Sequence, residues 1–265
     1  MMSAEHGPAP LLRIQPRFSH CAQWAQLAQR EGLFYEALEL SMAPMLDGNA
    51  PEAASCREWY KSSGRVHAIH GAFIDVNPAS GDPAFRELSR RRCRESCALA
   101  VALGAEQVVF HSSAFPFLRG GYLENWADLC AAFYMELAEE YSGLTLCIEN
   151  SQDLDPEPLE ALMKRTGNGV GVCLDIGHAN YSGAPLEAWF DVLGPSIACL
   201  HLSDNMGRFD DHLPLGDGGI DWALADRLYQ GLGKELPMTL EVGGLQGVEK
   251  SLAFLRRNGY FGLGG

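Results

Sequence analysis

Nine side chains of the types that bind metal ions follow the apolar runs of this chain. They stand at the ends of these runs or in the segments just after them, and they are Glu149, Glu241, Asp175, Asp210, His70, His111, His178, His201 and His212. Carboxylate and imidazole ligands without thiolate suit divalent zinc, manganese, cobalt or iron, and the residue types do not choose among these ions. We therefore predict a site for divalent ions.

One stretch illustrates the pattern. The apolar run that begins at Gly171 ends in Asp175, and His178 follows three residues later. The run fits a strand buried on both faces. Gly177 allows a sharp turn that brings the carboxylate and the imidazole to one pocket, with His178 on the loop after the strand. A single Asp-x-x-His pair is more often a helix cap and a surface histidine, so the prediction depends on the recurrence of such endings elsewhere.

The elements that must position these residues alternate regularly. The expected strands span residues 11–17, 33–40, 66–70, 105–110, 144–149, 171–175, 197–201 and 237–241. The expected helices span residues 20–30, 52–62, 83–103, 124–141, 156–165, 184–193, 220–232 and 247–257. Eight strand-helix units without a linker predict an α/β fold, a (β/α)8 TIM barrel in which residues 1–265 form a single domain.

Such a barrel gathers the carboxyl ends of all its strands on one face, where sites of this fold are built. The nine side chains would meet there, poorly solvated and mutually repelling unless cations held them. Residues two positions before an inward-pointing ligand also point inward, one layer deeper. We expect this deeper layer to consist of small side chains that bind no metal: Cys147, Cys173, Cys199 and Thr239. Glu39, in the second expected strand, is interpreted either as a structural carboxylate or as a substrate contact.

The composition limits the partners. With 265 residues and 47% hydrophobic content the chain can form one large core, and its net charge of −14 disfavours nucleic acid as a partner. The sequence has no apolar run of membrane-spanning length, and residues 1–10 do not resemble a secretion signal. Eight cysteines without a Cys-x-x-Cys pair fit the reduced, buried thiols of a cytoplasmic protein. The oligomeric state stays open, a homo-oligomer included.

Seven segments together resemble one superfamily. They are Ile69-His-Gly-Ala-Phe, Phe110-His-Ser, Cys147-Ile-Glu-Asn, Val172-Cys-Leu-Asp-Ile-Gly-His, Leu200-His-Leu-Ser-Asp-Asn, Asp210-Asp-His-Leu-Pro-Leu-Gly-Asp-Gly-Gly-Ile-Asp-Trp and Leu240-Glu-Val. From about residue 33 to its end, the chain resembles the xylose-isomerase-like barrels. This superfamily includes sugar-phosphate isomerases and epimerases, and also the family-2 AP endonucleases such as endonuclease IV.

The resemblance implies one to three divalent ions, bound at different sites in the two branches. In the isomerase branch, one divalent ion is bound by Glu149, Asp175, His201 and Glu241. The two glutamates are then also the catalytic residues that move protons. In the endonuclease branch, all nine positions hold three zinc ions. The acidic balance, a shorter chain and the segment Gly216-Asp-Gly-Gly-Ile-Asp-Trp depart from the endonuclease pattern and favour the isomerase branch.

The leading interpretation is a metal-dependent sugar or sugar-phosphate isomerase or epimerase. One glutamate would remove the proton α to a carbonyl and the other would return it, while the ion stabilises the enediolate-like charge. His178 and His212 would bind substrate hydroxyls or further ions, and Arg208 would pair with a phosphate. Two alternatives stay open: a phosphodiesterase with a multi-metal cluster, and a non-catalytic barrel that binds a sugar and reports it to a partner protein.

Overall fold

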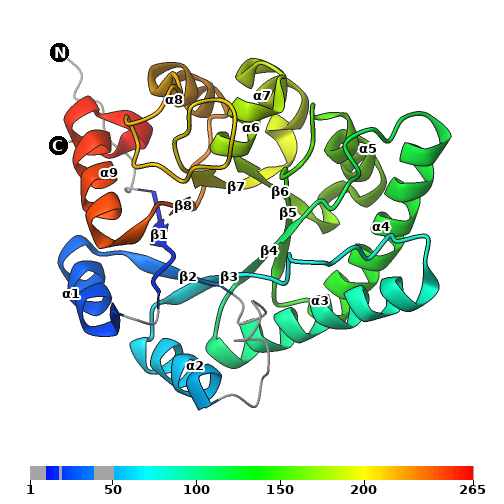
Figure 1. Ribbon diagram of the computed structural model, residues 1–265, viewed down its shortest axis with the longest axis horizontal. Coiled ribbons are helices and arrows are strands. Elements are labelled where there is room, and N and C mark those ends of the chain that lie inside the picture. Colours follow the sequence, from blue (N-terminus) through cyan, green and yellow to red (C-terminus); the bar gives the residue numbers. More distant parts are fainter. Residues whose placement is uncertain (1–9, 18–19, 39–50, 265) are drawn as a thin grey trace.

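Eight short strands pair in the order of the sequence, and the first closes the ring by pairing with the last (Figure 1). The computed structural model describes residues 10–17, 20–38 and 51–264. The strands are β1 (Leu12–Ile14), β2 (Phe34–Leu38), β3 (Val66–His70), β4 (Gln107–His111), β5 (Thr145–Glu149), β6 (Gly171–Asp175), β7 (Ile197–Leu202) and β8 (Met238–Leu240). All eight pairings are parallel, which confirms the predicted (β/α)8 barrel.

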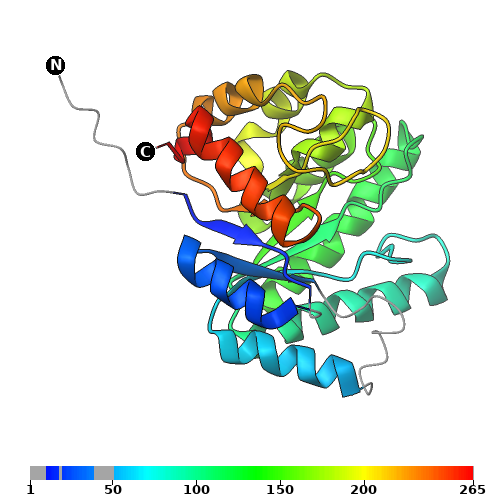
Figure 2. The ribbon, with the colours of Figure 1, turned by 60° about the vertical axis from the view of Figure 1, so that its left-hand side comes forward.

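Helices surround the barrel on its outer side (Figures 1 and 2). They are α1 (Cys21–Glu31), α2 (Pro51–Ser63), α3 (Pro83–Leu103), α4 (Gly121–Glu140), α5 (Glu157–Thr166), α6 (Ile176–Ser182), α7 (Leu186–Leu193), α8 (Trp222–Gly231) and α9 (Gly244–Asn258). Short 3-10 turns are η2 (Gly167–Gly169), η3 (Gly194–Ser196) and η4 (Tyr260–Gly262). Within the described part of the chain, no helix combines the length and the apolar character that crossing a membrane would require.

Local sequence signals fix where several helices begin and end. Asp82 caps α3, because its side chain accepts a hydrogen bond from the backbone nitrogen of Phe85 at 2.9 Å, and Pro83 occupies the first helical position. Gly104 ends the helix in the left-handed conformation, with φ of 75°. Because both signals are explicit in the sequence, the expected and observed bounds of this helix coincide.

The segment after β6 differs from the expectation. A loop carrying His178 was expected there, but the short helix α6 follows the strand directly. Asp175 is its N-cap, and its side chain accepts a hydrogen bond from the backbone nitrogen of His178 at 2.6 Å. The expectation of a loop is therefore wrong: the aspartate both ends the strand and begins the helix. Glu39 lies outside the described residues.

The inside of the barrel below the strand ends is closed by small side chains. Val109, Cys147, Cys173 and Cys199 form a buried cluster of their own, and Thr239 is fully buried as well. The expected layer of small, buried residues is therefore present, while its lack of metal binding stays a prediction. An ionic pair that the pattern did not predict lies in the same interior: Arg13 and Glu36, both with no exposed side-chain surface.

Candidate metal centre

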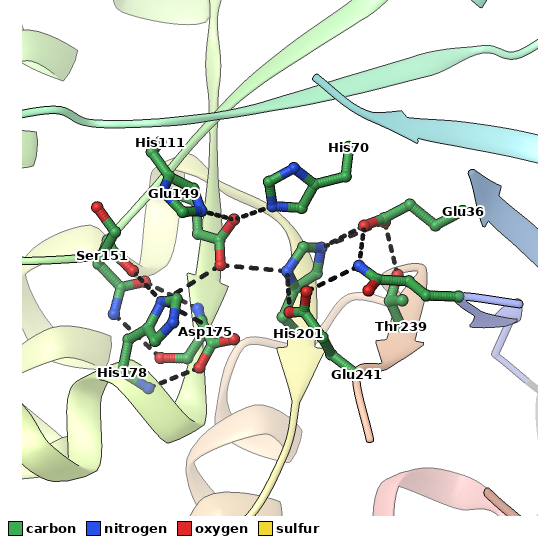
Figure 3. Close-up of polar contacts among 12 residues, drawn as sticks. Glu36, His70, His111, Glu149, Ser151, Asp175, His178, His201, Thr239 and Glu241 are labelled. Carbon is green, nitrogen blue, oxygen red and sulfur yellow. Dashed lines mark hydrogen bonds and ion pairs between the residues drawn. The ribbon is translucent and has the colours of Figure 1, made fainter. Parts of the chain in front are cut away.

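Glu149, at the end of β5, lies at the centre of the candidate site and is completely buried (Figure 3). Its Oε2 atom lies 3.4 Å from Nε2 of His70 and 3.7 Å from Nε2 of His111. Its Oε1 atom lies 3.2 Å from Nδ1 of His201 and 3.3 Å from Nδ1 of His178. The two oxygens of one carboxylate thus face two different groups of potential ligands.

Both groups are compact enough to hold an ion, and they adjoin each other, since His70 of one also lies close to His201 and Glu241 of the other. In the first, His70, His111 and Glu149 each offer one ligand atom, and the three atoms lie within 4.8 Å of one another. The second group meets the same limit and consists of Glu149, Asp175, His201 and Glu241. Glu149 belongs to both. Cys173, which was expected not to bind metal, also has its sulfur within 4.8 Å of ligand atoms of Glu149 and His201.

A third group lies on the long segment between β7 and α8 and on α6. The Oδ2 atom of Asp210 lies 3.3 Å from Nε2 of His178 and 3.0 Å from Nε2 of His212. His178 also contacts Glu149, so this group adjoins the second one. His212 has a positive φ of 47°, a conformation that few residues other than glycine adopt, which indicates that its placement is held by the surrounding loop.

Asp204 organises this loop. Its carboxylate is fully buried and accepts hydrogen bonds from the backbone nitrogens of Asn205 and Gly216 at 2.9 Å each, and from the indole Nε1 of Trp222 at 2.8 Å. The backbone of Asp204 also forms an antiparallel bridge with Leu213, next to His212. These bonds fold the loop back on itself and place Asp210 and His212 over the barrel mouth.

Three of the histidines are oriented in the same way. The Nδ1 atoms of His70, His178 and His212 lie 3.1, 2.7 and 2.7 Å from backbone carbonyl oxygens. A carbonyl oxygen can only accept, so each Nδ1 carries the proton and donates it. In the neutral form of each ring, the Nε2 lone pair is then directed at the carboxylates of the site. Metal-binding histidines are commonly held through such a bond to the other ring nitrogen.

The pKa values of the histidines reflect the surrounding carboxylates. Burial lowers the pKa of His70, but the neighbouring Glu149 outweighs this effect and raises it to about 9. Burial likewise lowers the pKa of His212, and its contact with Asp210 raises it to about 9. At His111, burial dominates and lowers the pKa to about 4. Without metal, His70 and His212 are thus protonated at neutral pH.

The pKa values of the carboxylates are shifted in both directions. Burial raises the pKa of Glu149, but the charge of His201 and the contact with His178 hold it well below its usual range. Burial raises the pKa of Asp175 to about 7, and His178 offsets this only in part. Three buried carboxylate oxygens of the candidate ligands accept no hydrogen bond of good geometry from the described residues: Oε2 of Glu149, Oδ2 of Asp175 and Oε2 of Glu241. Buried carboxylate oxygens without a hydrogen-bond partner are suitable ligands for divalent cations.

These shifts predict how the stability of the metal-free protein depends on pH. His70 and His212 have folded-state pKa values near 9, above the ordinary value of about 6.5, so they stabilise the fold fully below pH 6.5. That contribution is lost as the pH rises through about 9. We expect the melting temperature in EDTA to fall between pH 6.5 and 9. Because zinc displaces the same protons, we expect the increase in melting temperature on adding zinc to grow over this interval. A stabilisation by zinc that shrinks with rising pH would contradict the assignment.

The structure brings all nine predicted ligands into three adjoining groups. Arg208, expected to pair with a phosphate, is exposed on the loop between β7 and α8. The sequence pattern missed Glu36, together with its partners Arg13 and Gln15 on β1 and just after it. A charged residue in the middle of the apolar strand β2, with an arginine in the strand before it, was the signal that could have found this pair.

Comparison with known proteins identifies the family. The family model of the xylose isomerase-like TIM barrel matches residues 25–258. The chain belongs to this family. Among curated relatives of this xylose isomerase-like barrel, the protein MJ1311 of Methanocaldococcus jannaschii is 29% identical over 200 residues, which cover 71% of this chain and 68% of MJ1311. The probable endonuclease 4 of Mycobacterium leprae is 26% identical over 256 residues, covering 90% of this chain and 96% of that protein.

Solved structures of similar proteins have the same barrel fold. The TTHB071 protein from Thermus thermophilus, soaked with ZnCl2, is 25% identical, with a TM-score of 0.76, and the match covers 93% of this xylose isomerase-like barrel and 96% of that chain. A D-tagatose 3-epimerase-like protein is 23% identical with a TM-score of 0.72, over 93% and 96% of the two chains, and shows the shared fold. The match leaves out a larger share of this chain than of the Mycobacterium leprae protein, so it gives no support to the expectation of a chain shorter than the endonuclease relatives.

Proposed function

We propose that this chain is a hydrolase that cleaves a phosphodiester bond with a cluster of divalent ions. The observation that carries the proposal is the position of Glu149, whose two oxygens face two separate ligand groups. A single-ion isomerase would need one oxygen of this glutamate open to the substrate, but Oε2 faces His70 and His111 instead. The endonuclease 4 relatives, matched over 90% of this chain, support the same choice.

The described residues would divide the ions among three groups. His70 and His111 would share one ion with Glu149, and Asp175, His201 and Glu241 would complete a second around its other oxygen. His178, Asp210 and His212 would hold a third. Divalent ions at such positions stabilise negative charge on phosphoryl oxygens and make water more acidic.

Hydrolysis adds water across a P–O bond, so the attacking water loses a proton and the leaving oxygen gains one, from solvent or from the carboxylate that took up the first proton. Glu241 is suited to accept the first proton, since it is 11% exposed whereas the side chains of Glu149 and Asp175 are completely buried. Its Oε1 atom is held by Gln15 at 2.9 Å, which leaves Oε2 directed into the site. Arg208, exposed on the loop that carries Asp210, is placed to meet a substrate phosphate. The net charge of −14 favours small or short phosphodiesters over long duplexes.

A sugar isomerase or epimerase with one ion is the second candidate. It is supported by the two glutamates that face His201, with Oε1 of Glu149 at 3.2 Å and Oε2 of Glu241 at 3.0 Å from its Nδ1 atom. In that reaction the pair would remove and return a proton α to a carbonyl. The third group of ligands has no necessary role in it, and this difference separates the two candidates.

Asp210→Asn tests the choice. If three ions are used for hydrolysis, the variant should bind one ion fewer and cleave bis(p-nitrophenyl) phosphate or an oligonucleotide with an abasic site at least about tenfold more slowly. Elemental analysis of zinc per chain and initial rates measure both effects. The exposed neighbour Asp211 provides the matched control, Asp211→Asn, which should change neither.

The isomerase candidate makes the opposite prediction. Asp210→Asn would then keep full turnover, the wild-type chain would bind about one ion, and solvent deuterium would be exchanged into a sugar substrate. Glu241→Gln would abolish that exchange. A wild-type chain that binds one ion and exchanges deuterium into a sugar, without cleaving either phosphodiester, would replace the hydrolase proposal.

A further inference from the structure

His201 faces the candidate metal centre with a different ring nitrogen from its neighbours. Its Nδ1 atom lies 3.2 Å from Oε1 of Glu149 and 3.0 Å from Oε2 of Glu241. The other three oriented histidines direct Nε2 into the site and bond through Nδ1 to backbone carbonyls. To bind an ion through Nδ1, the neutral ring of His201 must therefore carry its single proton on Nε2.

Glu36 is the group that Nε2 of His201 meets (Figure 3). Its Oε1 and Oε2 atoms lie 3.0 and 3.2 Å from this nitrogen, and both side chains are completely buried. A carboxylate accepts the Nε2 proton and cannot donate one to the ring while it is ionised. The contact therefore selects the tautomer that leaves the lone pair on Nδ1, on the side of Glu149 and Glu241.

The carboxylate of Glu36 is itself held by donors alone. Oγ1 of Thr239 donates to its Oε2 at 2.7 Å, and Nε2 of Gln15 donates to its Oε1 at 3.0 Å. The guanidinium of Arg13 lies 3.4 Å from Oε2 and compensates the buried charge. Arg13 is held in turn by Gln107, whose Oε1 accepts from Nη1 at 2.5 Å. A charge buried this deeply requires such a network, which leaves the carboxylate one orientation.

Gln15 extends the network to a second ligand. The same Nε2 atom that donates to Glu36 lies 2.9 Å from Oε1 of Glu241, so the amide leaves the other oxygen of Glu241 directed at His201. Two members of the second ligand group, His201 and Glu241, are thus oriented by Glu36 on β2 and by Gln15 just after β1. Neither strand supplies any of the nine predicted ligands, yet these two side chains govern the geometry of two of them.

We propose that Glu36 is a positioning residue of the metal centre, which keeps His201 in the Nε2-protonated tautomer so that Nδ1 can bind an ion together with Glu149, Asp175 and Glu241. The inference rests on the proposed metal centre and adds to it a residue outside the ligand set. Loss of a hydrogen bond to a metal-binding histidine typically costs about 10–100-fold in metal affinity.

Glu36→Gln tests the role sharply. Thr239 and Arg13 would draw the amide oxygen of the new side chain toward themselves, which turns its NH2 group to Nε2 of His201. Nε2 would then have to accept, so the ring proton would move to Nδ1 and oppose the ion. We expect one of the zinc sites to weaken about 10–100-fold in competition with a chromophoric chelator, while the others keep their affinity.

A matched control and a milder variant accompany this test. Glu106→Gln removes a carboxylate that lies 3.7 Å from Nε2 of another histidine, His67, outside the ligand groups, and should leave all zinc affinities unchanged. Thr239→Val removes only the hydroxyl that orients Glu36 and leaves the charges in place. It should weaken the same single site by a smaller factor, which keeps the test decisive if Glu36→Gln does not fold.

The wild-type protein provides a readout that requires no substitution. In the zinc-loaded chain labelled with 15N-histidine, two-bond 1H–15N correlation spectra report which ring nitrogen carries the proton. We expect His201 to be protonated on Nε2, and His70, His178 and His212 on Nδ1. A proton on Nδ1 of His201, or unchanged zinc affinities in Glu36→Gln, would overturn the role of Glu36 while the metal centre stands. A wild-type chain that binds no zinc, manganese, cobalt or iron would overturn both.

Discussion

Glu149→Gln should leave a folded barrel that has lost two of the three proposed ions and all measurable turnover. Glu149 is the one residue shared by the first two ligand groups, with one oxygen facing each. Glutamine keeps the shape of the side chain but offers one neutral oxygen in place of two charged ones, so neither group stays complete. Mutation of a residue that only orients a ligand lowers metal affinity or activity about 10–100-fold. The loss of a ligand shared by two ions should lower them by more than that.

Zinc per chain and the rate of phosphodiester cleavage measure the two effects, and circular dichroism checks the fold. The control is Glu139→Gln, which makes the same chemical change on the exposed face of α4. A variant at position 149 that still bound three ions would remove the basis of the proposed function, because the shared carboxylate carries it. A wild-type chain that binds one ion, and whose exchange of deuterium into a sugar is abolished by Glu149→Gln, would point to the isomerase candidate instead.

Gly218→Ala should remove the third ion selectively. A Cβ atom at this position would lie 2.5 Å from the carbonyl oxygen and 2.7 Å from the nitrogen of Asn205, and it would overlap the carboxylate of Asp204. Such overpacking typically costs about 1–3 kcal/mol and would force the loop to shift. Asp210 and His212 would move with the loop. We expect zinc to fall from three ions per chain to two, and phosphodiester turnover to drop at least about tenfold, as in Asp210→Asn.

The neighbouring Gly219 provides a matched control for Gly218→Ala. A Cβ atom at Gly219 would meet nothing closer than the carbonyl oxygen of Asn205 at 3.8 Å, which is ordinary contact. Gly219→Ala should therefore keep three ions and nearly full activity. If both variants kept three ions, the loop would not depend on the packing of Asp204, and the account of how it positions the third group would be wrong.

Much of the fold and of the ligand set could be predicted from the sequence, because both follow from short-range patterns. An apolar run that ends in His70 or Glu149 predicts both the strand and the polar side chain at its carboxyl end. In a closed parallel barrel those ends must meet, whatever the details of packing. The bounds of α3 were equally explicit, since Asp82 and Gly104 mark its two ends.

The rest depends on contacts between residues far apart in the chain. Glu36 lies 165 positions from His201, and nothing in either strand alone indicates that they meet. Only the folded interior determines which ligand group each oxygen of Glu149 faces. The same holds for the ring nitrogen that each histidine directs into the site. The helix α6 was missed because the glycine after Asp175 indicated a turn, while the cap formed with His178 favours a helix.

The loop between β7 and α8 is folded mainly on its own carboxylate at Asp204 and on Trp222, and His212 joins it to the segment after β8 through the carbonyl oxygen of Glu241. We therefore expect the number of bound ions to vary independently of the barrel in this architecture. Exchanging one surface segment could add or remove a cation without redesigning the cylinder beneath it, and the same scaffold could in this way serve either two-step proton transfer or bond hydrolysis.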